Sequence, residues 1–249
     1  MNFRYIQLRN TIFCFFNKDS SFSMVSFIHL NRKKYQFLRL HNLIAFYLSI
    51  FVKTCYKQIR MKKLVFLHGS GYDKNAYNVL MHEVAKSCGA DLICFNAPFK
   101  HPNKFDKYTW FNKFEKDGRR DAVIEDYAYS LQYIKEQLNN LHIDTKNLIL
   151  IGHSQGGGMA VHIGLETELS SVISICGDLP YNISYKKVAK TPIYWLEGGK
   201  DTYIDDNRKK SYQLIENNNH FHLLRLMNST HSDFSDDFLK IIDKQGIKL

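Results

Sequence analysis

Three side chains in the second half of the chain have the types and the order that nucleophilic catalysis requires. Ser154 lies in the sequence GHSQG, Asp201 ends the later sequence EGGKD, and His231 lies in NSTHS. A serine hydroxyl is a poor nucleophile until a base removes its proton, and a histidine base needs a carboxylate to orient it. These residues therefore predict acyl transfer on the Ser154 hydroxyl, with His231 as the base and Asp201 as the orienting carboxylate.

The glycines around Ser154 favour this chemistry over an incidental serine. Gly152 and Gly156 flank Ser154 at two residues on either side, which is the G-x-S-x-G pattern of a sharp turn from a strand into a helix. Such a turn strains the backbone of the serine, and a Cβ at either flanking position would collide with the turn. The alternative is a glycine-rich loop, and the agreement of three post-strand positions in type and order argues against it.

Short apolar segments along the chain predict buried strands. Three of these segments directly precede Ser154, Asp201 and His231. The predicted strands are Leu64–Leu67, Leu92–Phe95, Asn147–Ile151, Val172–Ile175, Pro192–Leu196 and Phe221–Met227. Helical spacing from Tyr77 to Ala85 predicts a helix that is capped by Asp73 or Asn75 and ends near Cys88 and Gly89. Further helices are predicted over Asp121–Leu138 and Gly156–Leu165, and one that starts near Asp233. This alternation predicts an α/β fold with a mostly parallel central sheet, helices on both faces, and ligands at the carboxyl ends of the strands.

A glycine-rich turn, His68–Gly71, follows the first predicted strand. A dinucleotide site is disfavoured, because Lys74 stands where a third glycine is needed and no carboxylate ends the next strand. A turn at this edge of the sheet could instead point a backbone N–H group at a developing negative charge. A plain tight turn is the alternative.

The stretch Ala97–Arg120 is rich in aromatic residues, basic, and too long for an ordinary connection. We expect this stretch to be an irregular loop that forms a short lid over an acyl-binding groove. Trp110 and Phe111, in this loop, are candidate substrate contacts. Packing of these aromatic side chains onto the core is the alternative.

Other residues compete for the roles of acid and base. Asp205 and Asp206 are alternatives to Asp201, but they lie in what is predicted to be the start of the following helix. His68 and His153 flank the expected site, and packing is the better explanation of both.

No metal or cofactor site is predicted. His220 and His222 lie on one face of a strand, yet no third ligand accompanies them and no H-E-x-x-H motif occurs. Lys200 does not belong to a P-loop, because Asp201 follows where serine or threonine is required.

The charge of the chain is concentrated in its first sixty residues. The formal net charge is +10, but residues 1–60 hold ten basic side chains and one acidic one, so residues 61–249 carry only +1. A balanced surface gives no support to nucleic-acid binding. We therefore expect residues 61–249 to form the catalytic domain.

Residues 1–60 differ in composition from the rest, and three explanations compete. A transit peptide would be basic and poor in acidic residues, as this segment is, and would direct the protein to an organelle. A membrane anchor needs about 20 apolar residues, whereas the uncharged run Leu40–Val52 has thirteen. We favour the third explanation, a reading frame extended upstream of the true start, since Met61 leads directly into the first predicted strand; residues 1–60 are otherwise expected to be a poorly ordered basic extension.

The five cysteines favour a reducing compartment. Their number is odd and no C-x-x-C pair occurs, so free thiols are expected rather than disulfides or a zinc site; they are Cys14, Cys55, Cys88, Cys94 and Cys176. We expect a cytoplasmic protein without a stable membrane span, and the sequence does not determine its oligomeric state.

Residues 61–249 resemble the α/β-hydrolase superfamily, and in particular its phospholipase/carboxylesterase family, which includes acyl-protein thioesterases. The matching segments are Phe66–Gly69, Trp110–Phe111, Gly152–Gly157, Thr191–Pro192, the Gly-x-x-Asp that ends at Asp201, and the late His231. The resemblance implies a compact α/β-hydrolase fold, a Ser154, His231 and Asp201 triad, and oxyanion donors at the backbone N–H groups of Ser70 and Gln155. The chain departs from the family pattern in two places, and both leave the substrate open. Trp195–Glu197 stands where the family often has a His-Gly turn before the acidic residue, and the lid stretch is basic and aromatic.

Together these features predict a serine hydrolase that cleaves carboxylic esters or thioesters through an acyl-enzyme, without a cofactor. Small or flexible acyl substrates are expected. Because His231 must be neutral to act, activity should fall as the pH drops through about 6 to 7. The alternatives are a catalytically silent binding protein of the same fold, and a peptidase or lactone hydrolase with the same three residues.

Overall fold

The computed structural model describes residues 3–8, 11–18, 21–29, 62–116, 119–202, 211–217 and 220–244. The chain divides into two units, Met1–Gln58 and Ile59–Leu249. In the first unit β1 (Phe3–Leu8), β2 (Thr11–Lys18) and β3 (Ser21–His29) form an antiparallel sheet in the order β1-β2-β3. Sequence reasoning expected no regular element here, although these segments are rich in the aromatic and β-branched residues that favour strands.

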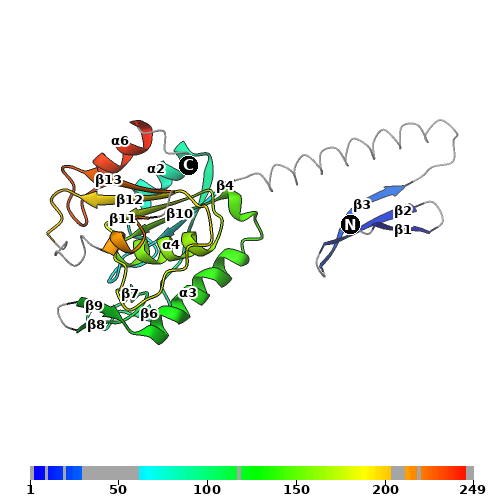
Figure 1. Ribbon diagram of the computed structural model, residues 1–249. Helices are drawn as coiled ribbons and strands as arrows, with labels where there is room; N and C mark the ends of the chain where they lie inside the picture. Colours follow the sequence, from blue (N-terminus) through cyan, green and yellow to red (C-terminus); the bar gives the residue numbers. More distant parts are fainter. Residues whose placement is uncertain are drawn as a thin grey trace. The chain divides into compact units, whose positions relative to one another are not determined.

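The second unit contains a sheet of six parallel strands (Figure 1). Its strands are β4 (Lys62–Leu67), β5 (Ala90–Cys94), β10 (Leu148–His153), β11 (Ser171–Ile175), β12 (Ile193–Gly198) and β13 (Phe221–Leu226). They are ordered β13-β12-β11-β10-β4-β5, and each neighbouring pair is parallel. The predicted parallel sheet is therefore confirmed, and each of its six strands lies within a residue or two of the predicted one.

Helices cover both faces of this sheet, as the sequence predicted (Figure 1). Helices α2 (Asn78–Ser87) and α6 (Ser235–Lys244) pack with strand residues such as Leu64 and Phe66. Helices α3 (Ile124–Asn139) and α4 (Gln155–Glu166) pack with the alternate residues, such as Val65 and Leu67. Because both faces are covered, the central strands β10 and β11 are buried at every position, whereas the edge strands β5 and β13 are partly exposed.

The start of α2 differs from the prediction. Neither Asp73 nor Asn75 caps this helix: Tyr77 is its N-cap residue, in the left-handed region with φ 55°. The Asp73 carboxylate instead accepts a hydrogen bond from the Asn75 N–H group at 2.8 Å and pairs with Lys107 at 2.6 Å. The prediction placed the cap too early because an Asx turn has the same sequence signature as a helix cap.

The long stretch after β5 is more regular than predicted. It contains two short antiparallel pairs, β6 (Phe99–Lys100) with β7 (Tyr108–Thr109) and β8 (Lys113–Lys116) with β9 (Arg119–Ala122). Two 3-10 helices, Thr145–Asn147 and Ser211–Leu214, complete the described elements. Asp121 belongs to β9, so α3 begins three residues later than predicted.

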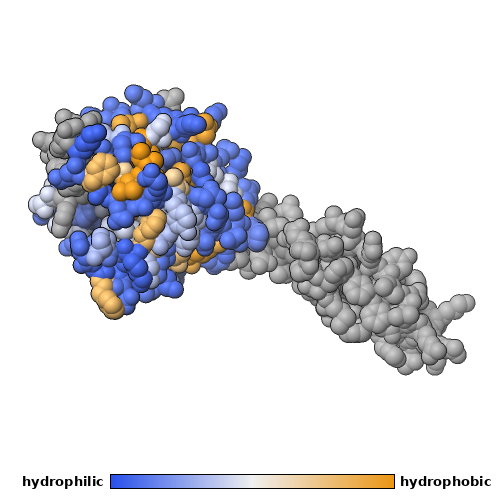
Figure 2. Space-filling view, turned by 90° about the horizontal axis from the view of Figure 1, so that it is seen from below, coloured by the Kyte–Doolittle hydropathy of each residue, from blue (hydrophilic) through white to orange (hydrophobic). Residues whose placement is uncertain are grey.

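The view from the side of β6–β9 and α3 shows a mostly hydrophilic surface with hydrophobic residues in small groups (Figure 2). Large hydrophobic side chains that are exposed are spread over different elements, among them Val79, Phe105, Ile124 and Val188. Among the described residues, no helix has both the length and the hydropathy that a membrane span requires.

Candidate active site

Ser154 occupies the strained turn between β10 and α4. Its backbone lies at φ 52° and ψ −119°, a region that non-glycine residues rarely adopt. A Cβ on Gly152 would overlap the carbonyl oxygen of Gly156, and a Cβ on Gly156 would overlap the carbonyl oxygen of Leu67. The spacing of the two glycines is therefore a steric requirement of this turn.

The structure brings Ser154, His231 and Asp201 into one hydrogen-bonded series. His231 Nε2 lies 3.1 Å from Ser154 Oγ, and His231 Nδ1 lies 2.8 Å from Asp201 Oδ2. With a neutral imidazole, Nδ1–H donates to the carboxylate and Nε2 accepts the serine O–H, which is the arrangement that general-base chemistry needs. Asp201 and Ser154 are buried, and the His231 side chain is 13% exposed.

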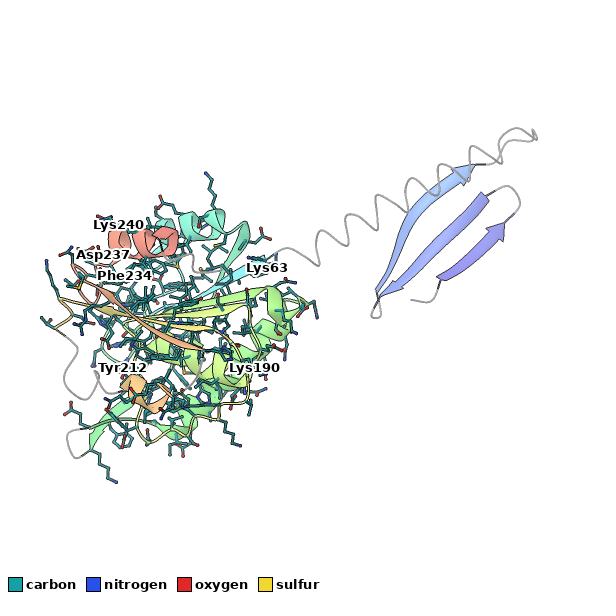
Figure 3. The ribbon with its side chains drawn as sticks, turned by 45° about the horizontal axis from the view of Figure 1, so that its top comes forward. Lys63, Lys190, Tyr212, Phe234, Asp237 and Lys240 are labelled. Carbon is teal, nitrogen blue, oxygen red and sulfur yellow. The ribbon has the colours of Figure 1, made fainter. Side chains whose placement is uncertain are left out.

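The loop that carries His231 is held by α6. Asp237 accepts hydrogen bonds at 2.9 Å from the Ser229 hydroxyl and from the Asn228 N–H group, and these bonds hold the pKa of the Asp237 carboxyl below its ordinary value. The Ser229 carbonyl in turn accepts the Lys200 N–H at 2.9 Å, next to Asp201. Figure 3 shows Asp237 and Phe234 close together at α6, at one edge of this unit.

His153 links the nucleophile turn to the His231 loop. Its Nε2–H donates to the His231 carbonyl oxygen at 2.7 Å, and its ring lies 5.0 Å from the His231 ring. The same ring stacks on Phe234 at 5.3 Å and meets Tyr77 edge-on at 5.1 Å. The predicted packing of His153 is thus accompanied by a hydrogen bond, which sequence reasoning did not foresee.

His68 fixes the turn after β4. Its Nε2 accepts the Ala97 N–H at 3.0 Å, so its Nδ1 carries the proton and donates to the Gly69 carbonyl oxygen at 2.8 Å. Burial lowers the pKa of His68, which keeps the ring neutral. The Trp110 indole N–H donates to the His68 carbonyl oxygen at 2.7 Å and ties the next segment to the same turn.

The Gln155 side chain fastens that segment to the nucleophile turn. Its Oε1 accepts the Trp110 N–H at 2.8 Å and the Thr109 hydroxyl at 2.9 Å, while its Nε2 donates to the Phe111 carbonyl oxygen at 2.7 Å. Ser70 joins this network, with its Oγ 3.0 Å from Thr109 Oγ1. Gln155 is the first residue of α4, where backbone N–H groups lack partners within the helix.

Trp110 and Phe111 lie in the core beneath the site. Their exposed fractions are 0% and 1%. The alternative of packing therefore describes their place in the structure, and direct contact with a substrate stays a prediction.

Four other residues were candidates, two as the acid and two as metal ligands. Asp205 and Asp206 lie outside the described residues. His222 stacks on Tyr194 with ring centroids 5.0 Å apart, and the His220 carbonyl oxygen accepts the Ile193 N–H at 2.8 Å.

One cysteine near the site carried no recognisable sequence signal. Cys176 follows β11 and is buried, with φ 48°. Within the described part of the chain, the one group of three side chains able to hold a metal ion consists of Cys176, Asp201 and His231, whose ligand atoms all lie within 4.8 Å of one another. Sequence reasoning missed this group because no motif surrounds Cys176, and only the strand order brings it beside Asp201 and His231.

Comparisons with known proteins give the family and the fold of this chain. A family model described as Phospholipase/Carboxylesterase matches residues 50–245. Esterase PE8 has a similar structure, with a TM-score of 0.62 and 20% identity, over 76% of this chain and 94% of that protein. A carboxylesterase from Bacillus cereus has a TM-score of 0.61 and 15% identity, over 77% of this chain and 90% of its own.

A third similar structure is SOBER1 from Arabidopsis thaliana, with a TM-score of 0.57 and 19% identity, over 74% of this chain and 96% of its own. At these identities the structural likenesses establish the fold. No curated protein sequence matches this chain.

Proposed function

We propose, from the premise that this chain belongs to the phospholipase/carboxylesterase family of α/β-hydrolases, that it cleaves carboxylic esters or thioesters through an acyl-enzyme on Ser154. Membership of the family makes the protein an esterase-type hydrolase. The roles of individual residues and the acyl-enzyme are our proposal.

The observation that carries the proposal is the uninterrupted series from Ser154 Oγ through the His231 ring to Asp201 Oδ2, with separations of 3.1 and 2.8 Å. A hydroxyl, an imidazole and a carboxylate in this order remove the serine proton and stabilise the imidazolium that results. The three residues follow three separate strands, and packing of the core does not by itself require them to form such a series in this order. A silent binding pocket would not need it.

In the first half of the reaction His231 Nε2 takes the Ser154 proton as Oγ forms a bond to the substrate carbonyl carbon. The carbonyl oxygen becomes negatively charged, and the N–H groups of Ser70 and Gln155 are the proposed donors to it. The protonated His231 then gives its proton to the alcohol or thiol as the bond to this leaving group breaks. The acyl group stays on Ser154 as an ester.

The second half repeats these steps with water. His231 takes a proton from the water molecule, whose oxygen attacks the acyl carbon, and returns that proton to Ser154 Oγ as the carboxylic acid leaves. Throughout, Asp201 keeps the Nδ1 proton in place, so the required tautomer is maintained.

Labelling with a serine-reactive phosphonate, followed by peptide mass spectrometry, tests the nucleophile. The full-length chain should be labelled at Ser154, and Ser154→Ala should lose both labelling and ester hydrolysis, with a fall in kcat of several powers of ten, on the order of 10⁴ or more. Ser87→Ala is the matched control, since this hydroxyl donates to the Val84 carbonyl in α2. Labelling that persists at another residue in Ser154→Ala would refute the assignment.

The substrate is resolved by a panel of p-nitrophenyl esters of rising chain length beside an acyl-thioester. A protein that binds these compounds without turnover would support the silent binding protein instead.

A further inference from the structure

A buried thiol lies beside the proposed acid and base. Cys176 directly follows β11, and its backbone N–H donates to the Leu196 carbonyl oxygen at 2.8 Å, which holds it against β12. Its Sγ, an oxygen of Asp201 and a ring nitrogen of His231 all lie within 4.8 Å of one another. The mechanism above needs Asp201 and His231 but has no use for this thiol.

The three groups match the ligands that zinc selects. Zn²⁺ binds cysteine sulfur at about 2.3 Å and histidine nitrogen or carboxylate oxygen at about 2.0 to 2.2 Å, usually in a tetrahedron. Ligand atoms of such a tetrahedron lie about 3.3 to 3.8 Å apart. A shift on the order of 1 Å, in side chains that approach from three loops, therefore brings the group to zinc-binding geometry.

Charge also suits a divalent cation at this position. Cys176 and Asp201 are 3% and 9% exposed, and burying an ion without compensation is costly. A Zn²⁺ ion held by one thiolate, one carboxylate and a neutral imidazole makes a group with no net charge. Burial therefore favours a divalent ion with this set of ligands over a singly charged one.

We propose that Cys176, Asp201 and His231 form an inhibitory site for Zn²⁺ inside the active site. Binding releases the Cys176 thiol proton to solvent, and the metal replaces the proton on His231 Nδ1, the nitrogen that faces Asp201 at 2.8 Å. The displaced proton moves to Nε2, so the imidazole stays neutral.

This change of tautomer removes the base. With a proton on Nε2, His231 donates toward Ser154 Oγ, 3.1 Å away, and can no longer accept its proton. Hydrolysis stops although the nucleophile is intact. Inhibition rests on the proposed function of these residues, whereas metal binding does not.

The other described cysteines supply matched controls. Cys88 Sγ donates to the Val84 carbonyl at 2.6 Å, and burial raises the pKa of its thiol. Burial raises the pKa of Cys94 to about 11. Neither belongs to a group of three metal ligands within the residues that the structure describes.

The test uses the full-length chain with all its cysteines reduced, and Co²⁺ as a spectroscopic substitute for Zn²⁺. Co²⁺ should bind at one equivalent with a thiolate-to-cobalt charge-transfer band, and Zn²⁺ should displace it. Cys176→Ser should abolish the band and weaken Zn²⁺ binding on the order of 100-fold or more, while a variant with serine at Cys14, Cys55, Cys88 and Cys94 should keep both.

Activity provides the second measurement. Each variant is compared with itself, as the ratio of ester hydrolysis in the presence and absence of Zn²⁺. The parent and the four-serine variant should be inhibited, with recovery on addition of a chelator, and Cys176→Ser should not be inhibited at the same concentration. A charge-transfer band that survives in Cys176→Ser, or a parent chain that binds no metal, would overturn the site.

The two proposals fail separately. A chain that binds Co²⁺ through Cys176 but hydrolyses no ester refutes the proposed function and keeps the metal site. A chain that is active and fully insensitive to Zn²⁺ refutes the inhibitory site and keeps the function.

Discussion

The nucleophile and its base are held in place by different physical means. Ser154 lies in a turn whose shape is dictated by backbone sterics, because a Cβ at Gly152 or at Gly156 would overlap a neighbouring carbonyl group. His231 lies in a loop whose shape is dictated by hydrogen bonds from distant elements, among them the bond from His153 at 2.7 Å. The first arrangement is visible in the sequence as two glycines, and the second has no local signature.

This difference has a consequence for substitutions. Changes in the nucleophile turn should act first on folding, because a clash with backbone cannot relax. Changes around His231 and Asp201 should act first on rate, because the loop can shift while the fold remains.

The largest expected effect is on the base side. In Asp201→Asn a neutral amide, which can donate as well as accept, replaces the carboxylate that accepts the Nδ1–H of His231. The tautomer with its proton on Nε2 is then favoured, and kcat should fall on the order of 10⁴-fold. The unfolding temperature should change little. Asp236→Asn, at an exposed position in the first turn of α6, is the matched control. A kcat within about tenfold of the parent would show that another carboxylate, such as Asp205 or Asp206, serves His231.

The second effect is on the nucleophile side and appears in stability. The methyl group of Gly156→Ala would overlap the Leu67 carbonyl oxygen, and the free energy of unfolding should fall by about 3 kcal/mol. Gly89→Ala is the control: nothing lies within 4 Å of its Cβ, although φ is +64°, so about 1 kcal/mol is expected. Urea unfolding measures both. A loss in Gly156→Ala no larger than that in Gly89→Ala would show that the overlap with the Leu67 carbonyl oxygen is relieved at little cost.

A smaller effect tests the connection between the two regions. His153→Phe keeps a ring against Phe234 but removes the N–H donor to the His231 carbonyl, so kcat should fall by about 10- to 100-fold with little change in KM. His153→Gln retains a donor and should recover part of the loss. If both variants keep the parent kcat, His153 serves packing alone.

The smallest effect is the dependence of stability on pH. Burial lowers the pKa of His68 and of His162 from 6.5 in the folded chain. Below pH 6.5 the unfolded chain therefore takes up protons that the folded chain does not, and the free energy of unfolding falls as the pH falls. Well above that pH both states are neutral at these residues, and no dependence arises from them.

Urea midpoints at pH 8 and pH 5.5 measure this dependence. His162→Gln should reduce the difference between the two midpoints, because it removes one of the two imidazoles whose pKa is lowered by burial. A midpoint difference unchanged by this substitution would show that His162 does not contribute.

Much of the fold could be predicted because its signals are local. The strands of the parallel sheet appear as short apolar runs, since both faces are covered, and the G-x-S-x-G spacing indicates the turn at Ser154. The start of α2 was misplaced because Asp73 and Asn75 form an Asx turn that resembles a cap. The hairpins β6–β7 and β8–β9 were missed because strands of two to four residues leave little pattern.

The sequence by itself determined the alternation of elements and the identities and chain order of Ser154, Asp201 and His231. Only the tertiary structure decided that Cys176 lies beside Asp201 and that His153 bonds to the His231 loop. The reason is the strand order β13-β12-β11-β10, which places loops from distant parts of the chain at one edge of the sheet. Contacts between such loops depend on strand pairing across the whole sheet, and no short stretch of residues encodes them.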